Sequence, residues 1–318
     1  MNEPIYSAFN PEAFQNKRTA VIDGDGFAWA IGWINREAIF EKELTDSVDS
    51  CIHDILQGVR AEHYIGVLSP DPFQILHPIL TEVPKMRPAE PNFRKAIAKS
   101  RPYKGNRPER PEWYLKWCPV IENHLEQAWG FIRTPESFEA DDLVATLMFE
   151  LTQAEAKPIC CGNDKDLLQI PGEHFNVVKK TIQTLDKYQC AYKLWIQCLM
   201  GDSTDGIEGI PGMGPKGAEK VLDVMKVTES NLNDGYRLAT FWQYIDKFGE
   251  DIGIQKFYEN YMLVKLRTDV PTDEFDLQEI CRGYELIRWE VQHFEENHAE
   301  DESDEPIPDF SIEQQKDE

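Results

Sequence analysis

The stretch TAVIDGDG, at residues 19–26, decides the architecture that we expect for the chain. Residues 19–22 form a short apolar run that predicts a buried strand, and the run ends in Asp23, Gly24 and Asp25. A strand buried on both faces is typical of a parallel sheet covered by helices. Ligands of such sheets bind beyond the carboxyl ends of the strands, where these carboxylates would lie.

Strand and helix patterns alternate through the first 200 residues. Apolar residues recur at three- and four-residue spacing between residues 45 and 62, which predicts a helix that Thr45 or Asp46 can cap. The alternation predicts the α/β class, with a mostly parallel central sheet flanked by helices. The further elements expected are strands at 64–68, 131–133, 158–161 and 175–179, helices at about 112–129, 138–152 and 188–199, and, after Gly201, helices at 215–225, 238–248 and 251–267.

The length suits one large domain or two closely packed ones. We divide the 318 residues into a polar N-terminal extension at 1–18, an α/β domain at 19–200, a helical region at 201–290 and an acidic tail at 291–318. The tail carries eleven acidic residues against one lysine, and two prolines interrupt any helix, so we expect it to be disordered. It either binds a protein partner or keeps the chain soluble.

The composition excludes several classes of protein. The chain has 33 Lys and Arg against 57 Asp and Glu, a formal net charge of −24. No run approaches the ~18 apolar residues of a membrane span, and the start lacks the basic and apolar segments of a signal peptide. Seven cysteines without a CxxC pair indicate neither a disulfide framework nor a zinc ribbon. We therefore expect a soluble cytoplasmic protein that does not bind membranes.

A basic segment interrupts this acidic background between residues 94 and 116. This segment contains eight basic residues and only two acidic ones, Glu109 and Glu112, which gives a local charge of +6. Aromatic residues are interleaved with the basic ones. Frequent prolines from 70 to 111 predict an irregular excursion, and long excursions are usually functional. Such a segment can contact phosphates and stack on bases, with Arg94 among the expected DNA-binding residues. A solvated charged helix face explains the segment equally well.

Acidic residues occur at four places where the predicted sheet would present a site. Each group alone has an ordinary explanation, because Asp caps turns and acidic residues favour the first turn of a helix. Together, eight carboxylates at one sheet edge would repel one another unless divalent cations neutralised them. Oxygen ligands without nearby His or Cys favour Mg²⁺ or Mn²⁺, and two such ions ~3.5–4 Å apart commonly serve phosphodiester hydrolysis. The expected ligands are Asp23, Glu139, Asp141, Asp142, Asp164, Asp166, Asp202 and Asp205.

The most specific pattern is GIEGIPGMGPKGAEKVL, at residues 206–222. Its glycines permit a tight turn with exposed backbone N–H groups, and Pro215 can begin a helix whose N-terminus attracts phosphate. This composition is typical of a helix-hairpin-helix, which holds a DNA backbone irrespective of sequence. An ordinary glycine-rich connection between helices is the alternative. The DNA-binding residues expected here are Gly209, Gly212, Gly214 and Lys216.

These motifs resemble those of the structure-specific 5′-nucleases, which include flap endonucleases, bacteriophage 5′→3′ exonucleases and the 5′-nuclease domain of bacterial DNA polymerase I. The resemblance covers roughly residues 19–270 and implies a PIN-like fold with a helical arch, at about 85–117, that encloses a free 5′ single strand. The matching stretches are VIDGDG at 21–26, FRKAIAKSRPYKGNR at 93–107, FEADDLVA at 138–145, GNDKDLLQ at 162–169 and GDSTDGIEGIPGMGPKGAEKVL at 201–222.

The resemblance also implies roles for individual residues. The eight carboxylates match the metal ligands of the family. Tyr103, Lys104 and Arg107 match a Tyr-Lys-x-x-Arg element, in which the Lys and the Arg contact the scissile phosphate and the Tyr stacks on a base.

The chain departs from the family pattern in several places. A further acidic ligand usually follows the second strand, and only Asp71, between two prolines, is a candidate here. Asp25 shares a strand face with Asp23 by two-residue alternation, yet it falls where the family has no ligand. Residues 72–91 and the acidic tail have no counterpart in the family.

We therefore expect a Mg²⁺-dependent 5′→3′ exonuclease and flap endonuclease that acts on DNA in replication or repair. Two or more Mg²⁺ ions are expected, Mn²⁺ can substitute, and a monovalent cation at the helix-hairpin-helix is a further expectation. The expected substrates are DNA with 5′ flaps or 5′ ends, and RNA–DNA hybrids are further candidates. The chain should act as a monomer in the cytoplasm, and its short form is most similar to phage-encoded proteins of bacterial hosts.

Two other functions compete with this one. The first is a catalytically silent protein that binds DNA junctions, and the intact carboxylates argue against it. The second is an RNA-directed nuclease with a related PIN-type sheet, and the hairpin at 206–222 argues against it, because such RNases commonly lack one.

Overall fold

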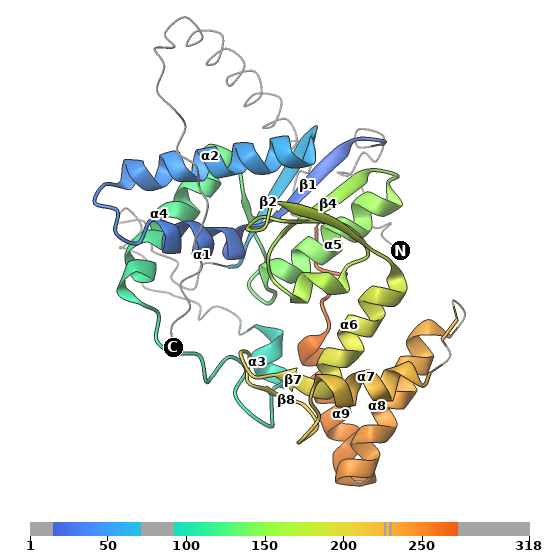
Figure 1. Cartoon of the computed structure of the whole chain (residues 1–318). Helices are drawn as coiled ribbons and strands as arrows, with labels where there is room; N and C mark the ends of the chain where they lie inside the picture. The colour runs from blue at the N-terminus through green and yellow to red at the C-terminus, as the bar shows by residue number, and fades with distance from the viewer. Residues whose placement is uncertain (1–14, 71–91, 226, 229–230, 273–318) are drawn as a thin grey trace, which may run out of the picture.

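The computed structural model describes residues 15–70, 92–225, 227–228 and 231–272 (Figure 1). The expected acidic tail and Asp71 lie outside the described residues, as do residues 1–14, 85–91 and 273–290 of the expected extension, arch and helical region. None of the described helices is long and apolar enough to cross a membrane.

A six-stranded sheet forms the centre of the α/β domain, in the order β3-β2-β1-β4-β5-β6 (Figure 1). Its strands are β1 (Arg18–Asp23), β2 (His63–Leu68), β3 (Ile132–Arg133), β4 (Lys157–Gly162), β5 (Gly172–Asn176) and β6 (Thr181–Leu185). The first five strands pair in parallel, and β6 is antiparallel to β5. The strand order reverses between β1 and β4. The expected mostly parallel sheet is confirmed.

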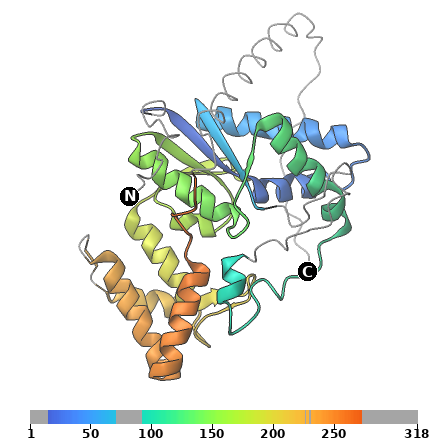
Figure 2. The ribbon, with the colours of Figure 1, turned by 180° about the vertical axis from the view of Figure 1, so that it is seen from behind.

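Helices cover both faces of this sheet (Figures 1 and 2). α1 (Gly24–Ile34), α2 (Glu41–Val59) and α4 (Glu112–Trp129) pack on one face, and α5 (Ala140–Gln153) packs on the other. Ala20 and Ile22 of β1 belong to the core beneath the three helices, whereas Val21 belongs to the core beneath α5. Both faces are buried, which explains why the strand sequences are apolar runs.

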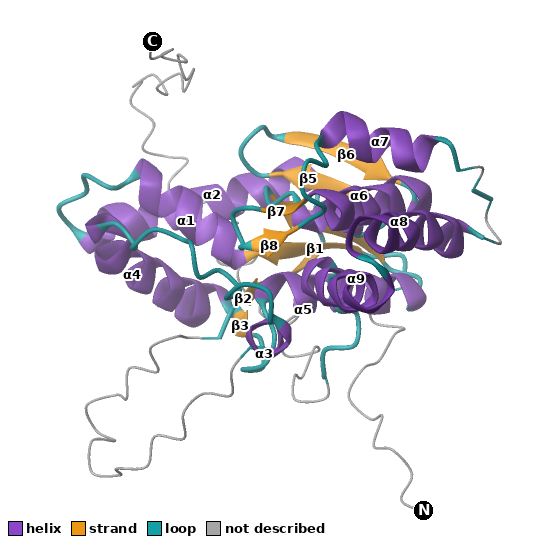
Figure 3. Ribbon diagram, turned by 90° about the horizontal axis from the view of Figure 1, so that it is seen from below, coloured by secondary structure: helices purple, strands orange, loops and turns teal. Residues whose placement is uncertain are grey.

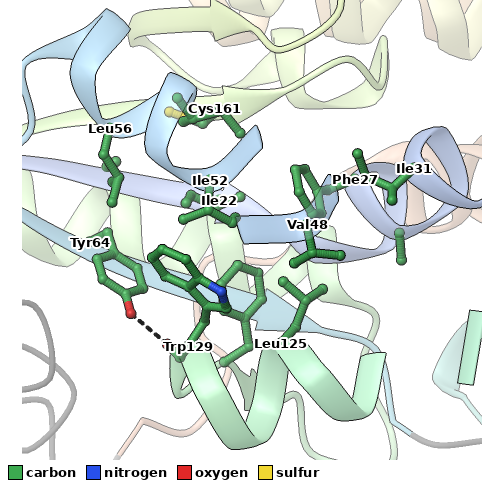
Figure 4. Packing of buried hydrophobic residues seen from close by; sticks show 14 of the residues in the cluster. Ile22, Phe27, Ile31, Val48, Ile52, Leu56, Tyr64, Leu125, Trp129 and Cys161 are labelled. Atoms are coloured by element: carbon green, nitrogen blue, oxygen red, sulfur yellow. Dashed lines mark hydrogen bonds between the residues drawn. The ribbon is translucent and has the colours of Figure 1, made fainter. Parts of the chain in front are cut away.

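The first of these cores lies between the sheet, α2 and α4 (Figure 4). Val48, Ile52 and Leu56 recur every four residues along α2, so they face the sheet as one row. Full burial of an aliphatic side chain stabilises the fold by ~1.5–3 kcal/mol relative to its exposure. Tyr64 of β2 reaches α4, where its hydroxyl donates to the backbone carbonyl of Trp129 at 2.6 Å. This bond satisfies the polar atom of an otherwise buried ring.

The remaining described elements include a helical module (Figure 3). It consists of α6 (Lys187–Met200), β7 (Gly201–Asp202), β8 (Ile207–Glu208), α7 (Pro215–Asp223), α8 (Leu232–Phe248) and α9 (Glu250–Val264). Trp195 of α6 stacks on Tyr261 of α9, with ring centroids 5.2 Å apart, in a third core. The short helix α3 (Phe93–Ile97) packs on α9, and the module therefore contacts the beginning of the basic segment.

The structure differs from the sequence-based expectation in several elements. The helix expected at 45–62 is α2, which begins at Glu41 with Phe40 as its N-cap, so neither Thr45 nor Asp46 caps it. Residues 24–34 form α1, although its glycines are weak helix formers, because Asp23 caps the helix and its apolar side is buried. The strand expected at 175–179 ends at Asn176, whose side chain accepts the N–H groups of Val178 and Lys179 in a turn that leads into β6. α8 begins at residue 232 rather than 238.

Candidate active site

The candidate site begins at the edge of the sheet where the strand order reverses. Asp23 is the last residue of β1 and caps α1, its side chain accepting the N–H of Gly26 at 3.4 Å. Asp164 follows β4, the neighbouring strand, so both carboxylates lie at the carboxyl edge of the sheet. A Cβ atom at Gly162 would come within 3.2 Å of the Asp23 Cβ and 2.6 Å of Leu167, and the glycine therefore permits this close packing.

A second group of carboxylates joins this site from η3 and the helical module. Asp166 begins the 3₁₀ turn η3 (Asp166–Gln169), Asp202 ends β7, and Asp205 lies between β7 and β8. One oxygen of each of these residues lies within 4.8 Å of the other two. Gln197 of α6 donates to Asp166 Oδ1 at 2.7 Å and to Asp202 Oδ2 at 3.3 Å, which fixes their spacing. This cluster offers only carboxylate oxygens, a donor set that fits Mg²⁺ or Mn²⁺.

The third group surrounds the N-terminus of α5. Glu139 is the N-cap residue, and Asp142 accepts the Glu139 N–H at 3.2 Å. Asp141 lies between them in the first turn. The positive end of the helix dipole favours acidic residues here, so capping accounts for part of this motif.

Protein groups bind both carboxylate oxygens of Asp142. Arg94 donates to Oδ2 at 2.6 Å and to Oδ1 at 2.7 Å, and the backbone N–H of Arg267 donates to Oδ1 at 2.9 Å. Asp142 and Arg94 are 0% and 1% exposed. The expected contact of Arg94 with DNA does not fit this burial, because its guanidinium is paired inside the protein. The metal-ligand role expected for Asp142 stays a prediction. Protein donors already bind both of its carboxylate oxygens, which argues against this role.

The Tyr-Lys-x-x-Arg element contacts the other carboxylates of the site. The Tyr103 hydroxyl lies 2.8 Å from Glu139 Oε2 and 3.2 Å from Asp205 Oδ2 and can donate to either. Lys104 donates to Glu139, and Arg107 donates to Asp205. The Tyr103 ring is 7% exposed and packs in the third core, so in this arrangement it cannot stack on a base. Lys104 and Arg107 keep partial exposure beside the carboxylates.

Burial raises the pKa values of the carboxylates near β1 and η3. Burial, with the negative charges of Asp25 and Asp164, raises the pKa of Asp23 to about 7. Burial and the charge of Asp164 raise the pKa of Asp166 to about 6. These groups resist ionisation because burial removes their hydration and the neighbouring carboxylates repel a further negative charge. A divalent ion would compensate for both effects.

The pKa values of two further carboxylates, Asp141 and Asp202, shift in opposite directions. Burial and the charges of Asp142 and Glu139 raise the pKa of Asp141 well above its ordinary value. Burial also acts on Asp202, but the hydrogen bond and charge of Lys165, at 2.7 Å, outweigh it and lower the pKa. Positive charge beside these carboxylates therefore favours their ionised forms.

Asp25 has a structural contact of its own. It lies in the first turn of α1, and its Oδ1 accepts the N–H of Ser69 at 2.9 Å. The alternation that would place it on the face of Asp23 does not apply, because β1 ends at Asp23. Asp25 thus ties α1 to the end of β2.

The predicted helix-hairpin-helix runs from α6 through the hairpin to α7. A Cβ atom at Gly209 would come within 2.1 Å of the Met200 backbone, so this glycine serves close packing. Gly212, with φ +84°, and Gly214, the N-cap of α7, have open space around them. Lys216 is exposed in the first turn of α7. Accessible N–H groups and a lysine at a helix N-terminus can bind phosphate.

Sequence reasoning missed Trp29 and Trp33, because it did not predict α1. The Trp29 ring lies 5.0 Å from that of Trp113 and 5.1 Å from that of Tyr114, and the Arg36 guanidinium lies 4.4 Å from the Trp33 ring. Trp29 and Trp33 are 43% and 52% exposed. Trp29 and Trp33 are four residues apart, so they lie on the same side of α1. This spacing could have identified the pair if the helix had been predicted.

Relatives of the chain decide its family. The profile of the family described as 5′-3′ exonuclease, N-terminal resolvase-like domain, matches residues 84–194. A 5′-3′ exonuclease of Buchnera aphidicola subsp. Schizaphis graminum is 30% identical over 221 residues, which cover 62% of this chain and 75% of the relative. The chain belongs to the 5′-nuclease family. A flap endonuclease Xni of Shewanella loihica is also 30% identical to this 5′-nuclease, over 53% of the chain and 68% of the relative.

Solved structures from bacteriophage T5 share the fold of this 5′-nuclease. The T5 D15 flap endonuclease, in a complex with DNA and metal ions, matches with a TM-score of 0.56 and 17% identity, over 85% of this chain and 100% of that chain. The T5 5′-exonuclease with bound zinc matches with a TM-score of 0.55 and 18% identity, over 84% and 97% of the two chains. The family resemblance read from the motifs is confirmed.

Proposed function

We propose that this 5′-nuclease hydrolyses DNA phosphodiesters close to the junction of a 5′ single strand with duplex, as a Mg²⁺-dependent 5′→3′ exonuclease and flap endonuclease. The observation that carries the proposal is that two cations of one segment, Lys104 and Arg107, contact carboxylates from separate elements. Lys104 contacts Glu139 before α5, and Arg107 contacts Asp205 between β7 and β8. A phosphodiester at this point would meet metal-binding oxygens and two cations together.

The carboxylates divide into two sets that would hold divalent ions. One set is the cluster of Asp166, Asp202 and Asp205. The other comprises the carboxylates at the ends of β1 and β4 and at the start of α5, which are Asp23, Asp164, Glu139 and Asp141. When bound, such ions lower the pKa of water and neutralise charge on the reacting phosphate.

Lys104 and Arg107 would stabilise the phosphate charge that develops during cleavage. Their present partners, Glu139 and Asp205, are carboxylates of the metal sets, and ions that neutralise these carboxylates would free both cations for phosphate. Fixed cations aimed at developing charge are among the largest contributions to phosphoryl transfer. The Tyr103 hydroxyl, between the same two carboxylates, would hold them in place.

The N-terminus of α7 would bind the duplex part of the substrate. Gly212 and Gly214 are exposed and have open space around them, and Lys216 adds a positive charge at this helix N-terminus. These groups recognise phosphates and not base edges, so binding would follow the shape of the DNA. A monomeric state, cytoplasmic localisation, use of Mn²⁺, a monovalent cation at the hairpin and cleavage of RNA–DNA hybrids remain predictions.

The test is cleavage of a 5′-labelled flap duplex, beside a blunt duplex and a single strand, in Mg²⁺, Mn²⁺ or EDTA. We expect metal-dependent cutting near the flap junction. Asp202→Asn should abolish cutting, whereas Asp25→Asn, a matched loss of one carboxylate outside the metal sets, should retain it. Tight binding of the flap without cutting in either metal would establish the silent junction binder instead. Cutting of RNA alone would favour the RNA nuclease.

A further inference from the structure

We infer that Glu259 of α9 is a positioning residue, which fixes the segment carrying Tyr103, Lys104 and Arg107 onto the helical module. The inference rests on the proposed function, because it concerns how the phosphate-contacting cations are held. Glu259 lies outside the carboxylate sets described above, and none of the sequence motifs contains it.

The Glu259 carboxylate binds the beginning of this segment through three hydrogen bonds. Its Oε1 accepts the backbone N–H groups of Lys99 and Ser100, both at 2.7 Å, and its Oε2 accepts the Ser100 hydroxyl at 2.7 Å. Residues 98–101 lie outside any helix or strand. Hydrogen bonds to a charged acceptor are stronger than those between neutral groups, so this carboxylate anchors an irregular stretch.

The other end of the segment is held by the turn between β7 and β8. The Lys104 N–H donates to the Asp205 carbonyl at 2.7 Å, and Gly105 donates to the Pro102 carbonyl at 3.0 Å. Gly206 lies so close that an added Cβ would come within 3.1 Å of the Pro102 oxygen. The segment is thus fixed upstream by α9 and downstream by this turn.

Lys104 needs both anchors because of its backbone conformation. Its φ is +57°, in the left-handed region, which is unfavourable for a residue other than glycine and persists only where the surroundings fix it. Without the upstream anchor, the chain before Lys104 could relax and move the ammonium group away from Glu139. A displacement of about 1 Å in a catalytic group can lower a rate by about 10²-fold.

The two anchors also belong to one rigid unit. Asn260, the residue after Glu259, donates to the Glu208 carbonyl and to the Tyr244 hydroxyl, both at 2.5 Å. This network joins α9 to β8 and α8, so the distance between the upstream and downstream anchors is set inside the helical module. Glu259 should therefore affect alignment of the cations and leave the duplex contact at α7 unchanged.

Steady-state kinetics on the flap substrate test the inference. Glu259→Ala should lower kcat by about tenfold or more and change KM by no more than about twofold. Glu259→Gln keeps an oxygen that can accept both N–H groups, so it should recover most of the rate. Glu250→Ala is the matched control, an exposed carboxylate of the same helix that forms no hydrogen bond or ion pair within the described residues. It should cut at the wild-type rate.

Hydrogen exchange provides a readout that does not depend on cleavage. The Lys99 and Ser100 amides should exchange faster in Glu259→Ala than in the wild type and regain protection in Glu259→Gln. Ser100→Ala, which leaves the Glu259 carboxylate in place, should lower kcat by about two- to threefold through loss of the hydroxyl's bonds to Glu259 and Lys256. Glu259→Ala that retains wild-type kcat, or that raises KM alone, would overturn the inference. A wild-type protein that never cuts would overturn the proposed function instead. The exchange rates would then still test whether Glu259 anchors the segment.

Discussion

The guanidinium of Arg94 and the carboxylate of Asp142 form a bidentate ion pair inside the protein, with N–O distances of 2.6 and 2.7 Å. Arg94 begins the basic segment on α3, and Asp142 lies in the first turn of α5. The Arg94 Nε also donates to the Leu263 carbonyl at the end of α9, at 3.0 Å. The pair therefore joins three segments that are distant in sequence, and it places α5 and its acidic residues against the helical module.

Loss of one partner of this pair should destabilise the protein strongly. Arg94→Met leaves the Asp142 carboxylate buried without its cation, which typically costs about 3–5 kcal/mol. Asp142→Leu should cost less, because Arg94 keeps an ion pair with Glu139 at 3.2 Å. The double variant should be more stable than the sum of the single effects allows, because two apolar side chains replace the pair. Urea unfolding of the four proteins measures this coupling, and strictly additive losses would show that the two side chains do not act as a pair.

The metal-free protein should lose stability as the pH rises. Burial raises the pKa of Asp23 to about 7 and that of Asp166 to about 6, so the folded state holds these protons more tightly than the unfolded chain does. Their contribution is present below the ordinary carboxyl pKa of about 3.9 and is lost as the pH rises through about 6 to 7. Burial lowers the pKa of His174, which acts in the opposite direction.

The melting temperature in EDTA, measured from about pH 5 to about pH 8, checks this expectation. Asp23→Asn removes the larger of the two effects, so the melting temperature of the variant relative to wild type should rise with pH. In Mg²⁺ the wild type should gain more at the alkaline end, because the ion competes with protons for the same oxygens. A constant difference between variant and wild type would show that Asp23 does not titrate in this range.

The sequence predicts the sheet and its acidic edge because those features are local. β1 is an apolar run that ends in Asp23, and the helices of the α/β domain after α1 show clear periodicity. The roles of Arg94 and Asp25 could not be read in this way, because each depends on a partner from another element. Arg94 meets Asp142 only after α3 packs on α9, and Asp25 meets Ser69 only because α1 replaces a continued strand. Charge alone assigns Arg94 to a DNA contact that its burial does not favour, and two-residue alternation places Asp25 on a strand that ends at Asp23.

The hairpin before α7 should contribute affinity without sequence preference. Lys216→Ala removes a charge at the exposed N-terminus of α7, so it should weaken duplex binding equally for unrelated sequences. The slope of log affinity against log salt should become shallower by about 0.9, the value for one phosphate contact on duplex DNA. Lys220→Ala, an exposed lysine on the same helix but far from its N-terminus, is the control. A loss that depends on sequence would indicate base readout.

Lys104 and Arg107 should act on the rate of cleavage and not on metal affinity. Each pairs with a carboxylate of the metal sets, Lys104 with Glu139 and Arg107 with Asp205, so each competes with a divalent ion for that carboxylate. Removal of either cation should lower kcat by about 10²-fold, the usual cost of losing one group that stabilises developing charge. Metal binding should be unchanged or tighter, because a competitor is gone.

Calorimetric titration of Mn²⁺ and single-turnover cleavage, applied to Lys104→Ala and Arg107→Ala, separate these two effects. Lys116→Ala serves as the control, because its ammonium group lies 3.8 Å from the Trp117 ring on α4 and contacts no site carboxylate in the described structure. Weaker Mn²⁺ binding together with the lower rate would mean that the cations act by organising the metal ligands. Unchanged or tighter binding with a slower rate places them on the phosphate, because only the step that develops charge would then have lost its stabilisation.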